Sequence, residues 1–305
     1  MHSERRSSDE LPKGILDDRK LPDDSFDALW ESIIVEPELK ARLLSQSLLN
    51  FTLRSKVDRA RVPMHGVIIL VGPPGTGKTS LARGLASKTA RVLHAKGGFR
   101  YLEVESHGLA SQSLGRSQQA VKHLLGSVIA ERAESGPLIV VLDEVETLAA
   151  DRKKMSMDAN PVDVHRATDA VLAQLDQLAS TYPELLFLAT SNFTAAIDDA
   201  FLSRADFIVN VDVPGPEACH WILKDTLAEL ATKFPRLAKL ADDPKIKRAA
   251  ERCDGLDGRR IRKAVISALT WDKETALDPS QLTAEHVLRA VEDAQRSNAL
   301  KEKKP

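Results

Sequence analysis

The sequence predicts an α/β domain with a parallel sheet, followed by a small all-helical domain. Between residues 67 and 213, short apolar runs alternate with longer segments whose apolar residues recur at helical spacing, which is the pattern of a parallel sheet covered by helices. After Pro214-Gly215-Pro216 only helical segments follow. We therefore expect an α/β domain over 21–214 and a helical domain over 215–299.

The elements are expected in the following chain order. Residues 1–20 are polar and of mixed charge, which predicts a flexible N-terminal tail, and 300–305 is expected to be a solvated C-terminal tail. Apolar runs predict strands at 67–71, 101–105, 138–142, 185–189 and 207–213. Helical spacing predicts helices at 37–54, 78–90, 116–133, 163–179, 217–232, 244–253, 259–271 and 283–296.

Composition and charge narrow the class of protein. Lys and Arg number 43 against 44 Asp and Glu, a net charge of −1, so binding to nucleic acid or to an anionic membrane is not favoured. The longest apolar runs span about five residues, against the roughly 20 that a membrane-spanning helix needs. Cys219 and Cys253 lack the spacing of a disulfide framework or a metal site. We expect a cytoplasmic protein without a secretory signal.

The strongest motif is GPPGTGKT at residues 72–79, a G-x-x-x-x-G-K-[ST] loop between a predicted strand and a predicted helix. Its glycines let the backbone curl so that successive N–H groups, together with the helix N-terminus, point at phosphate oxygens. An ordinary glycine-rich turn is the alternative. Lys78 would neutralise the β- and γ-phosphates, and the Thr79 hydroxyl would complete a Mg²⁺ shell. The residues expected to bind a nucleoside triphosphate here are Gly75, Thr76, Gly77, Lys78, Thr79 and Ser80.

A second motif places two carboxylates after the apolar run 138–142. In a parallel sheet, Asp143 and Glu144 would lie beside the phosphate loop. We expect Asp143 to hold Mg²⁺ through water and Glu144 to polarise the attacking water. A purely structural Asp-Glu pair is the alternative, which its position about 65 residues after Lys78, with one intervening strand, disfavours.

The next apolar run, 185–189, is followed by Thr190-Ser191-Asn192. A polar residue at that strand end would lie between the other two motifs, so Asn192 is expected to orient the attacking water. A simple turn residue is the alternative.

Two arginines are candidates for contact with the γ-phosphate. Arg204 lies in DDAFLSRAD (198–206), in a loop expected to face away from its own phosphate site, so its target would be the nucleotide of a neighbouring subunit. Arg259 opens a helix of the second domain in GLDGRR (255–260) and could report the state of the γ-phosphate. Surface arginines are abundant, so each assignment depends on the other motifs.

Together these segments resemble the AAA+ ATPases. GPPGTGKTS, VVLDEVETLAADR, ATSN, DDAFLSRAD and GLDGRRIRKA fall in that superfamily's order and spacing. The segments LPDDSFDALWESIIVEPELKARLL, VESHGL, DAVLAQLDQL and VPGPEA are more specifically similar to the pachytene-checkpoint / thyroid-hormone-receptor-interactor family, whose members remodel HORMA-domain proteins. The likeness covers residues 21–295.

The resemblance implies a P-loop three-layer αβα domain with a small helical lid domain, Mg²⁺-dependent hydrolysis of ATP, and a homohexamer. It also implies a HORMA-domain substrate engaged by a central pore. Since only residues 1–20 precede the match, a bacterial member is expected, of the kind found beside nucleotidyltransferases in anti-phage operons.

Two departures from the family pattern and two alternative functions remain at this point. Ser113 and Leu114 fall in the first pore loop, where translocases usually carry an aromatic residue, and Leu114 is the large apolar candidate there. Arg204 stands alone where many relatives have two arginines. A nucleotide switch or loader acting on DNA, and a general protein unfoldase, are the alternative functions.

Overall fold

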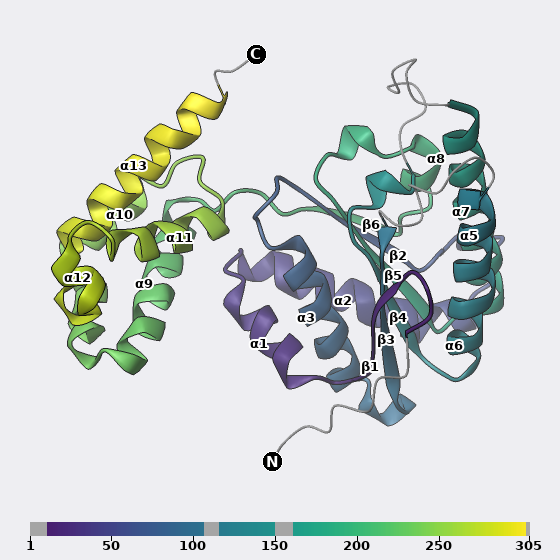
Figure 1. Ribbon diagram of the computed structural model, residues 1–305. Helices are drawn as coiled ribbons and strands as arrows, with labels where there is room; N and C mark the ends of the chain where they lie inside the picture. Colours follow the sequence, from purple (N-terminus) through teal and green to yellow (C-terminus); the bar gives the residue numbers. More distant parts are fainter. Residues whose placement is uncertain (1–10, 107–115, 150–160, 303–305) are drawn as a thin grey trace. The chain divides into compact units, whose positions relative to one another are not determined.

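The computed structural model describes residues 11–106, 116–149 and 161–302. The chain folds as two compact units (Figure 1). The large unit contains the residues up to Ser32, Glu38–Gly72 and Lys78–Asn210. The helical unit contains Ile33–Pro37, Pro73–Gly77 and the residues from Val211 onward. The main division thus falls after Asn210, close to the boundary expected at residue 214.

The described strands form one sheet in the large unit. They are β1 (Ile15–Leu21), β2 (Val67–Val71), β3 (Phe99–Val104), β4 (Leu138–Leu142), β5 (Leu185–Ser191) and β6 (Phe207–Asn210). Their order is β1-β3-β4-β5-β2-β6, with β1 antiparallel to β3 and the other neighbours parallel. The all-apolar runs become β2 and β4, which are buried along their whole length, as central strands covered on both faces should be.

β1 corrects the expected N-terminal tail and adds one antiparallel strand to the parallel sheet that the sequence predicts. The sequence predicts a tail through residue 20, but Ile15–Leu21 is the antiparallel edge strand. Its two apolar ends are buried, and between them Asp18 accepts hydrogen bonds from Arg100 at 2.6 Å and from Arg132 at 3.2 Å. Since charged residues fill the middle of the strand, ion pairs with distant residues replace the apolar alternation by which strands are predicted.

Helices cover both faces of the sheet, which gives three layers (Figure 1). One face carries α1 (Asp24–Ser32), α2 (Pro37–Leu53) and α3 (Lys78–Val92), and the other carries α5 (Arg116–His123), α6 (Ala130–Glu134) and α7 (Pro161–Thr181). On the first face, Phe26 and Phe51 meet Tyr101 and Phe99 of β3 edge to face. The helix expected over 116–133 is interrupted by a π-helical turn, Leu124–Ile129, and the short α8 (Asp199–Leu202) precedes β6.

Asp206 joins the segment before β6 to the beginning of β2. Its carboxylate accepts hydrogen bonds from the backbone N–H groups of His65 at 2.8 Å, Gly66 at 2.6 Å and Val67 at 3.2 Å. Its own N–H donates to the carbonyl of Val67 at 2.8 Å. Arg204 lies two residues before Asp206 in the sequence. The segment that carries this arginine is therefore hydrogen-bonded to the beginning of β2.

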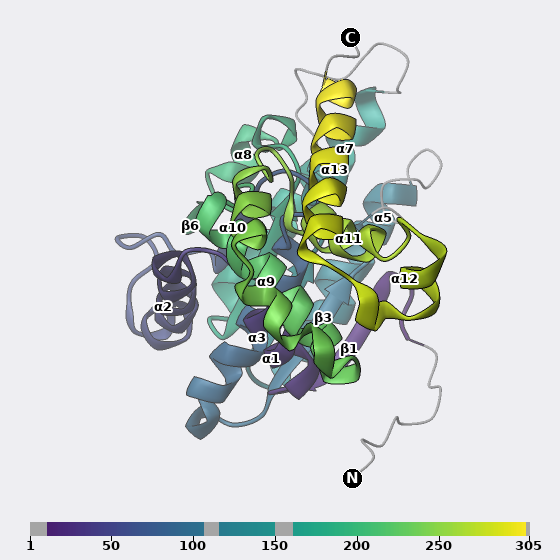
Figure 2. The same ribbon diagram turned by 90° about the vertical axis from the view of Figure 1, so that its left-hand side faces the viewer.

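The helical unit contains α9 (Pro216–Lys233), α10 (Pro244–Glu251), α11 (Gly258–Ala268), α12 (Lys273–Leu277) and α13 (Ala284–Glu302) (Figure 2). Leu223, Val265 and Val287 lie in its buried core. The helices expected from 217 onward are thus present, each with a shifted end. Short 3₁₀ turns lie at Arg54–Lys56, His94–Lys96, Val145–Thr147, Thr194–Ala196, Pro235–Asp242 and Pro279–Gln281.

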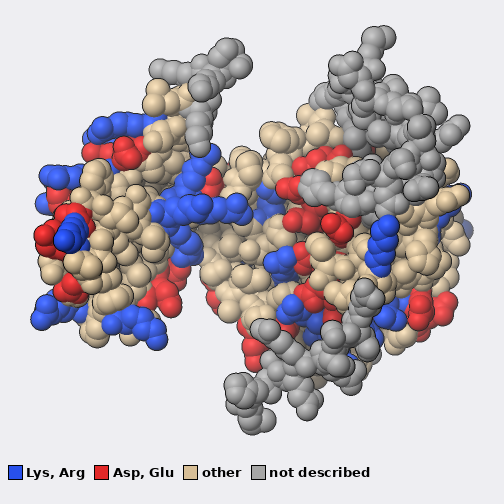
Figure 3. All heavy atoms as spheres, viewed as in Figure 1, with Lys and Arg blue, Asp and Glu red and all other residues tan. Residues whose placement is uncertain are grey.

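The charges on the surface and the lengths of the helices agree with what the composition of the sequence suggests. On the face shown in Figure 3, each unit carries both basic and acidic side chains, as the net charge of −1 suggests. None of the helices in the described ranges combines the length and the apolar character that crossing a membrane requires.

Candidate active site

Three neighbouring strands end in polar side chains at one edge of the sheet. β4, β5 and β2 are adjacent and parallel, so their carboxyl ends lie together, where sites in α/β sheets form. Lys78 and Thr79 open α3 after β2, Asp143 and Glu144 follow β4, and Asn192 follows β5. The contacts described below connect these five predicted residues within the large unit.

Lys78 is held between the end of β2 and the end of β5. Its side chain is buried, and its ammonium donates to the carbonyl of Gly72 at 2.8 Å and to Oδ1 of Asn192 at 3.0 Å. The N–H of Gly72 donates in turn to the carbonyl of Ser191 at 3.2 Å. A positive charge is therefore fixed at the N-terminus of α3, where the helix dipole also favours an anion.

Thr79 and Asp143 form an oxygen-rich pair beside Lys78. The Thr79 hydroxyl donates to Oδ1 of Asp143 at 2.7 Å, and the Thr190 hydroxyl donates to the same carboxylate oxygen. Hydroxyl and carboxylate oxygens suit Mg²⁺, which at phosphates usually takes only one or two protein carboxylates. The donor set thus fits the metal role predicted for Thr79 and Asp143.

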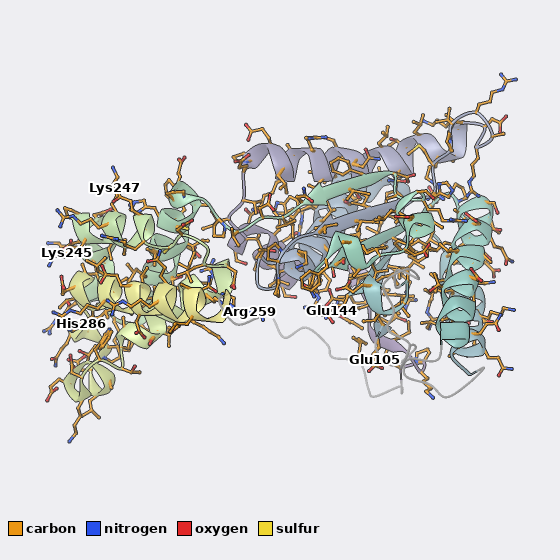
Figure 4. All side chains as sticks on the ribbon, turned by 90° about the horizontal axis from the view of Figure 1, so that it is seen from above. Glu105, Glu144, Lys245, Lys247, Arg259 and His286 are labelled. Carbon is orange, nitrogen blue, oxygen red and sulfur yellow. The ribbon has the colours of Figure 1, made fainter. Side chains whose placement is uncertain are left out.

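Glu144 has a left-handed backbone, with φ 52° and ψ 54°, and no other non-glycine residue in the described ranges has a positive φ. That conformation costs about 1–2 kcal/mol and persists only where neighbouring groups enforce it. The Glu144 N–H donates to Oγ1 of Thr190 at 3.1 Å, and its Oε1 accepts from Nδ2 of Asn192 at 3.3 Å. Figure 4 shows Glu144 beside the strand ends. The two residues predicted to handle the attacking water are therefore in contact.

Two further side chains at this edge were not identified from the sequence. Thr190 connects Glu144 to Asp143, and Glu146 accepts the backbone N–H of Asn192 through Oε1 at 3.1 Å. Strand alternation could have identified the threonine, because residues two apart lie on the same face of a strand and Thr190 precedes Asn192 by two.

The phosphate loop has a backbone that requires glycine. Gly75 and Gly77 have φ of +87° and +93°, which residues with a Cβ rarely adopt. A Cβ on Gly75 would lie 2.4 Å from Oδ1 of Asp257, and a Cβ on Gly77 would lie 2.6 Å from Cδ1 of Ile33. Both glycines are therefore needed for the packing of the loop itself, in addition to any approach of a phosphate.

The remaining predicted nucleotide-binding residues lie as follows. The Thr76 hydroxyl donates to the carbonyl of Pro73 at 3.0 Å and closes the loop. Ser80 is half-buried in the first turn of α3. Arg259 is exposed in the first turn of α11 (Figure 4), and its backbone N–H is 3.4 Å from the carbonyl oxygen of Gly75. The contact of the Arg259 side chain with a nucleotide stays a prediction.

Arg204 does not contact this group of residues. Its Nε and Nη2 donate to Oδ1 and Oδ2 of Asp176 at 3.0 and 2.6 Å, and its Nη1 donates to the carbonyl of Ala200 at 2.6 Å. Its contact with a neighbouring subunit stays a prediction. Ser113 and Leu114, the predicted pore-loop residues, lie outside the described residues.

Comparison with known proteins decides the family. Residues 68–213 match the ATPase family associated with various cellular activities (AAA). CD-NTase-associated protein 6 of Pseudomonas aeruginosa is 55% identical over 286 residues, which are 94% of this chain and 94% of that protein. The chain belongs to the AAA ATPases. The pachytene checkpoint protein 2 homolog of Arabidopsis thaliana is 36% identical over 280 residues, 80% of this chain and 59% of that protein.

Solved structures agree with this family. The structure of PCH-2 from C. elegans superposes with a TM-score of 0.74 at 27% identity, covering 95% of this chain and 77% of that one. A chain from the structure described as an E. coli MS115-1 HORMA:CdnC:Trip13 complex superposes with a TM-score of 0.71 at 18% identity, covering 91% and 94%, and shares the fold. The resemblance to the pachytene-checkpoint family is confirmed, and this AAA protein is an ATPase with a nucleotide-binding domain.

Proposed function

We propose that this AAA ATPase acts as a Mg²⁺-dependent homohexamer that changes the conformation of a HORMA-domain protein or disassembles its complexes. The observation that carries the proposal is the 55% identity to CD-NTase-associated protein 6 over 94% of both chains. The structure of the same fold that contains HORMA, CdnC and Trip13 supports the choice of substrate. Through its HORMA partner, the ATPase would regulate a bacterial nucleotidyltransferase that acts against phage.

The chemical step in this proposal is the attack of water on the γ-phosphorus of ATP. Glu144 accepts the proton that the water loses, and Asn192, which donates to Glu144 and accepts from Lys78, orients that water. The bond between the γ-phosphorus and the bridging oxygen breaks, and its electron pair leaves with ADP. Lys78 stabilises the charge on the β- and γ-oxygens. Thr79 and Asp143 would hold Mg²⁺, which neutralises phosphate charge when bound.

Arg204 would complete the site of a neighbouring subunit. An arginine has five N–H donors, and three of those on Arg204 bond to Asp176 and Ala200 within the described part of the chain. One N–H on Nη1 and one on Nη2 are left in these contacts, and guanidinium N–H groups bind phosphate oxygens well. A closed ring of identical subunits would place this arginine at each neighbouring nucleotide, with Ser113 and Leu114 lining the channel.

The test mixes the ATPase with a HORMA-domain protein of the same genome bound to its partner protein. ATP should release the partner, and release should fail with a non-hydrolysable analogue or with Glu144→Gln. If ATP is hydrolysed while the HORMA complex stays intact, the proposed substrate is wrong. If unrelated folded proteins are disrupted equally well, the chain is a general unfoldase.

A further inference from the structure

The hydroxyl of Thr190 lies between the two carboxylate residues that follow β4. It accepts the N–H of Glu144 at 3.1 Å and donates to Oδ1 of Asp143. The register explains this position, because Leu142 of β4 pairs with Ala189 of β5, which places the next residues, Asp143 and Thr190, beside each other. Thr190 is 1% exposed, whereas Asp143 and Glu144 are half-buried, so its hydroxyl approaches them from the buried side.

This arrangement demands a hydroxyl at residue 190. The Oγ1 atom must accept from a backbone N–H and donate to a carboxylate at the same time, and among small side chains only Ser and Thr do both. Without it, the N–H of Glu144 would lose this acceptor, and the left-handed backbone of Glu144 would lose a bond that enforces it.

We propose that Thr190 is a positioning residue for hydrolysis. Its hydroxyl fixes the backbone of Glu144 relative to Asp143, so that the base and the metal ligand keep one mutual geometry. The inference rests on the proposed role of Glu144 as the base. Thr190 touches neither the phosphate loop nor Lys78 in the described contacts, so it should act on the chemical step and leave nucleotide binding unchanged.

The experiment compares steady-state ATP hydrolysis, nucleotide affinity and melting temperature in a set of full-length variants. Thr190→Val removes the hydroxyl and keeps the shape, and Thr190→Ser keeps the hydroxyl. Thr89→Val is the matched control, because Thr89 is also a fully buried threonine of the large unit, whose hydroxyl bonds to Ser47 at 2.7 Å. Glu144→Gln and the double variant Glu144→Gln/Thr190→Val complete the set.

Thr190→Val should lower kcat about tenfold or more, as a small misplacement of a reacting group does, with the KM for ATP and the nucleotide affinity unchanged. Thr190→Ser should restore kcat, and Thr89→Val should lower the melting temperature with kcat unchanged. In the Glu144→Gln background, Thr190→Val should lower the rate no further, because both substitutions act through the carboxylate of Glu144.

The following results would contradict the inference or the proposed function. If Thr190→Val and Thr89→Val have the same kcat, or if Thr190→Ser is as slow as Thr190→Val, the hydroxyl is only structural and the inference is wrong. A further loss of rate in the double variant would also overturn it. If Glu144→Gln hydrolyses ATP at the parental rate, the proposed function fails in its assignment of the base, and this result is separate from those of the Thr190 variants.

Discussion

Arg204 and Asp176 form a bidentate ion pair within one subunit, with 3.0 Å from Nε to Oδ1 and 2.6 Å from Nη2 to Oδ2. The hydrogen bonds from Arg204 lower the pKa of the Asp176 carboxyl below its ordinary value, so the pair is charged at neutral pH. The pair uses one edge of the guanidinium and fixes its plane. In the proposed function, we expect Asp176 to orient the rest of the guanidinium toward the nucleotide of a neighbouring subunit.

Replacing Arg204 should slow hydrolysis because the active site of the neighbouring subunit loses a positive charge. Arg204→Ala should lower kcat roughly a hundredfold to a thousandfold, as the loss of one transition-state donor does. Mixing it with Lys78→Ala should restore part of the rate, because intact sites form where the two variants meet. Asp176→Asn should cause a smaller loss, since the arginine remains but is no longer oriented. The ATP-bound protein should be a hexamer by light scattering, and an active monomer at high dilution would contradict this prediction.

Glu144→Gln should bind ATP normally and turn it over roughly a hundredfold to ten-thousandfold more slowly, the usual contribution of a general base. The amide keeps the shape of the side chain but accepts no proton from water. Lys78→Ala should instead weaken nucleotide binding, because Lys78 provides the fixed positive charge at the loop. Equilibrium binding and single-turnover hydrolysis separate the two effects. Loss of binding in Glu144→Gln would show that the carboxylate has a structural role.

Leu114→Ala tests the proposed pore loop. Contact of an apolar side chain with the substrate should contribute about 1–2 kcal/mol per engaged subunit, so the variant should lose HORMA remodelling while its basal ATP hydrolysis and melting temperature are preserved. Ser113→Ala, which removes no apolar surface, is the neighbouring control. Unchanged remodelling, or a joint loss of remodelling, hydrolysis and stability, would count against the pore role.

Glu103→Gln should destabilise the large unit by about 2–4 kcal/mol, because a buried ion pair loses one partner. Glu103 is buried and accepts from Nε of Arg83 at 2.9 Å, from its Nη2 at 2.5 Å, and from the hydroxyl of Tyr101 at 2.7 Å. Burial and the Glu103 carboxylate raise the pKa of Tyr101, so the phenol stays protonated and donates. Glu285→Gln, in an exposed pair with Arg289, is the control and should cost less than about 1 kcal/mol. Urea unfolding measures both.

Stability should fall in mild acid partly through His65. Burial lowers the pKa of His65 below 6.5, and Arg59 acts in the same direction. Below pH 6.5 the unfolded chain therefore binds more protons than the folded chain. The free energy of unfolding decreases as the pH falls, until the pH is below the lowered pKa of His65. His65→Gln should lose less stability than the parent between about pH 7.5 and about pH 5.5. Equal losses in urea titrations would exclude His65 as a source of this dependence.

The sequence predicts the parts of this protein whose signal is local. β2 and β4 are all-apolar runs, and the phosphate loop, Asp143 and Asn192 follow strands at fixed spacing. β1 could not be predicted from the sequence, because the charged residues in its middle are stabilised by arginines far along the chain. Strand alternation could have placed Thr190 on the same face as Asn192, but its contacts with Asp143 and Glu144 depend on the register between β4 and β5, which no single strand encodes.

The hydrogen bonds between Asp206 and the beginning of β2 affect how movement can pass through the large unit. β2 runs from Val67, which Asp206 holds, to the residues that open the phosphate loop, a length of roughly 16 Å at about 3.3 Å per residue. The segment that carries Arg204 and the phosphate loop are thus separated by a strand that is hydrogen-bonded on both sides, to β5 and to β6. We expect the large unit to act in this respect as a rigid spacer, so that movement at one end reaches the other as rotation of the whole unit and not as internal bending.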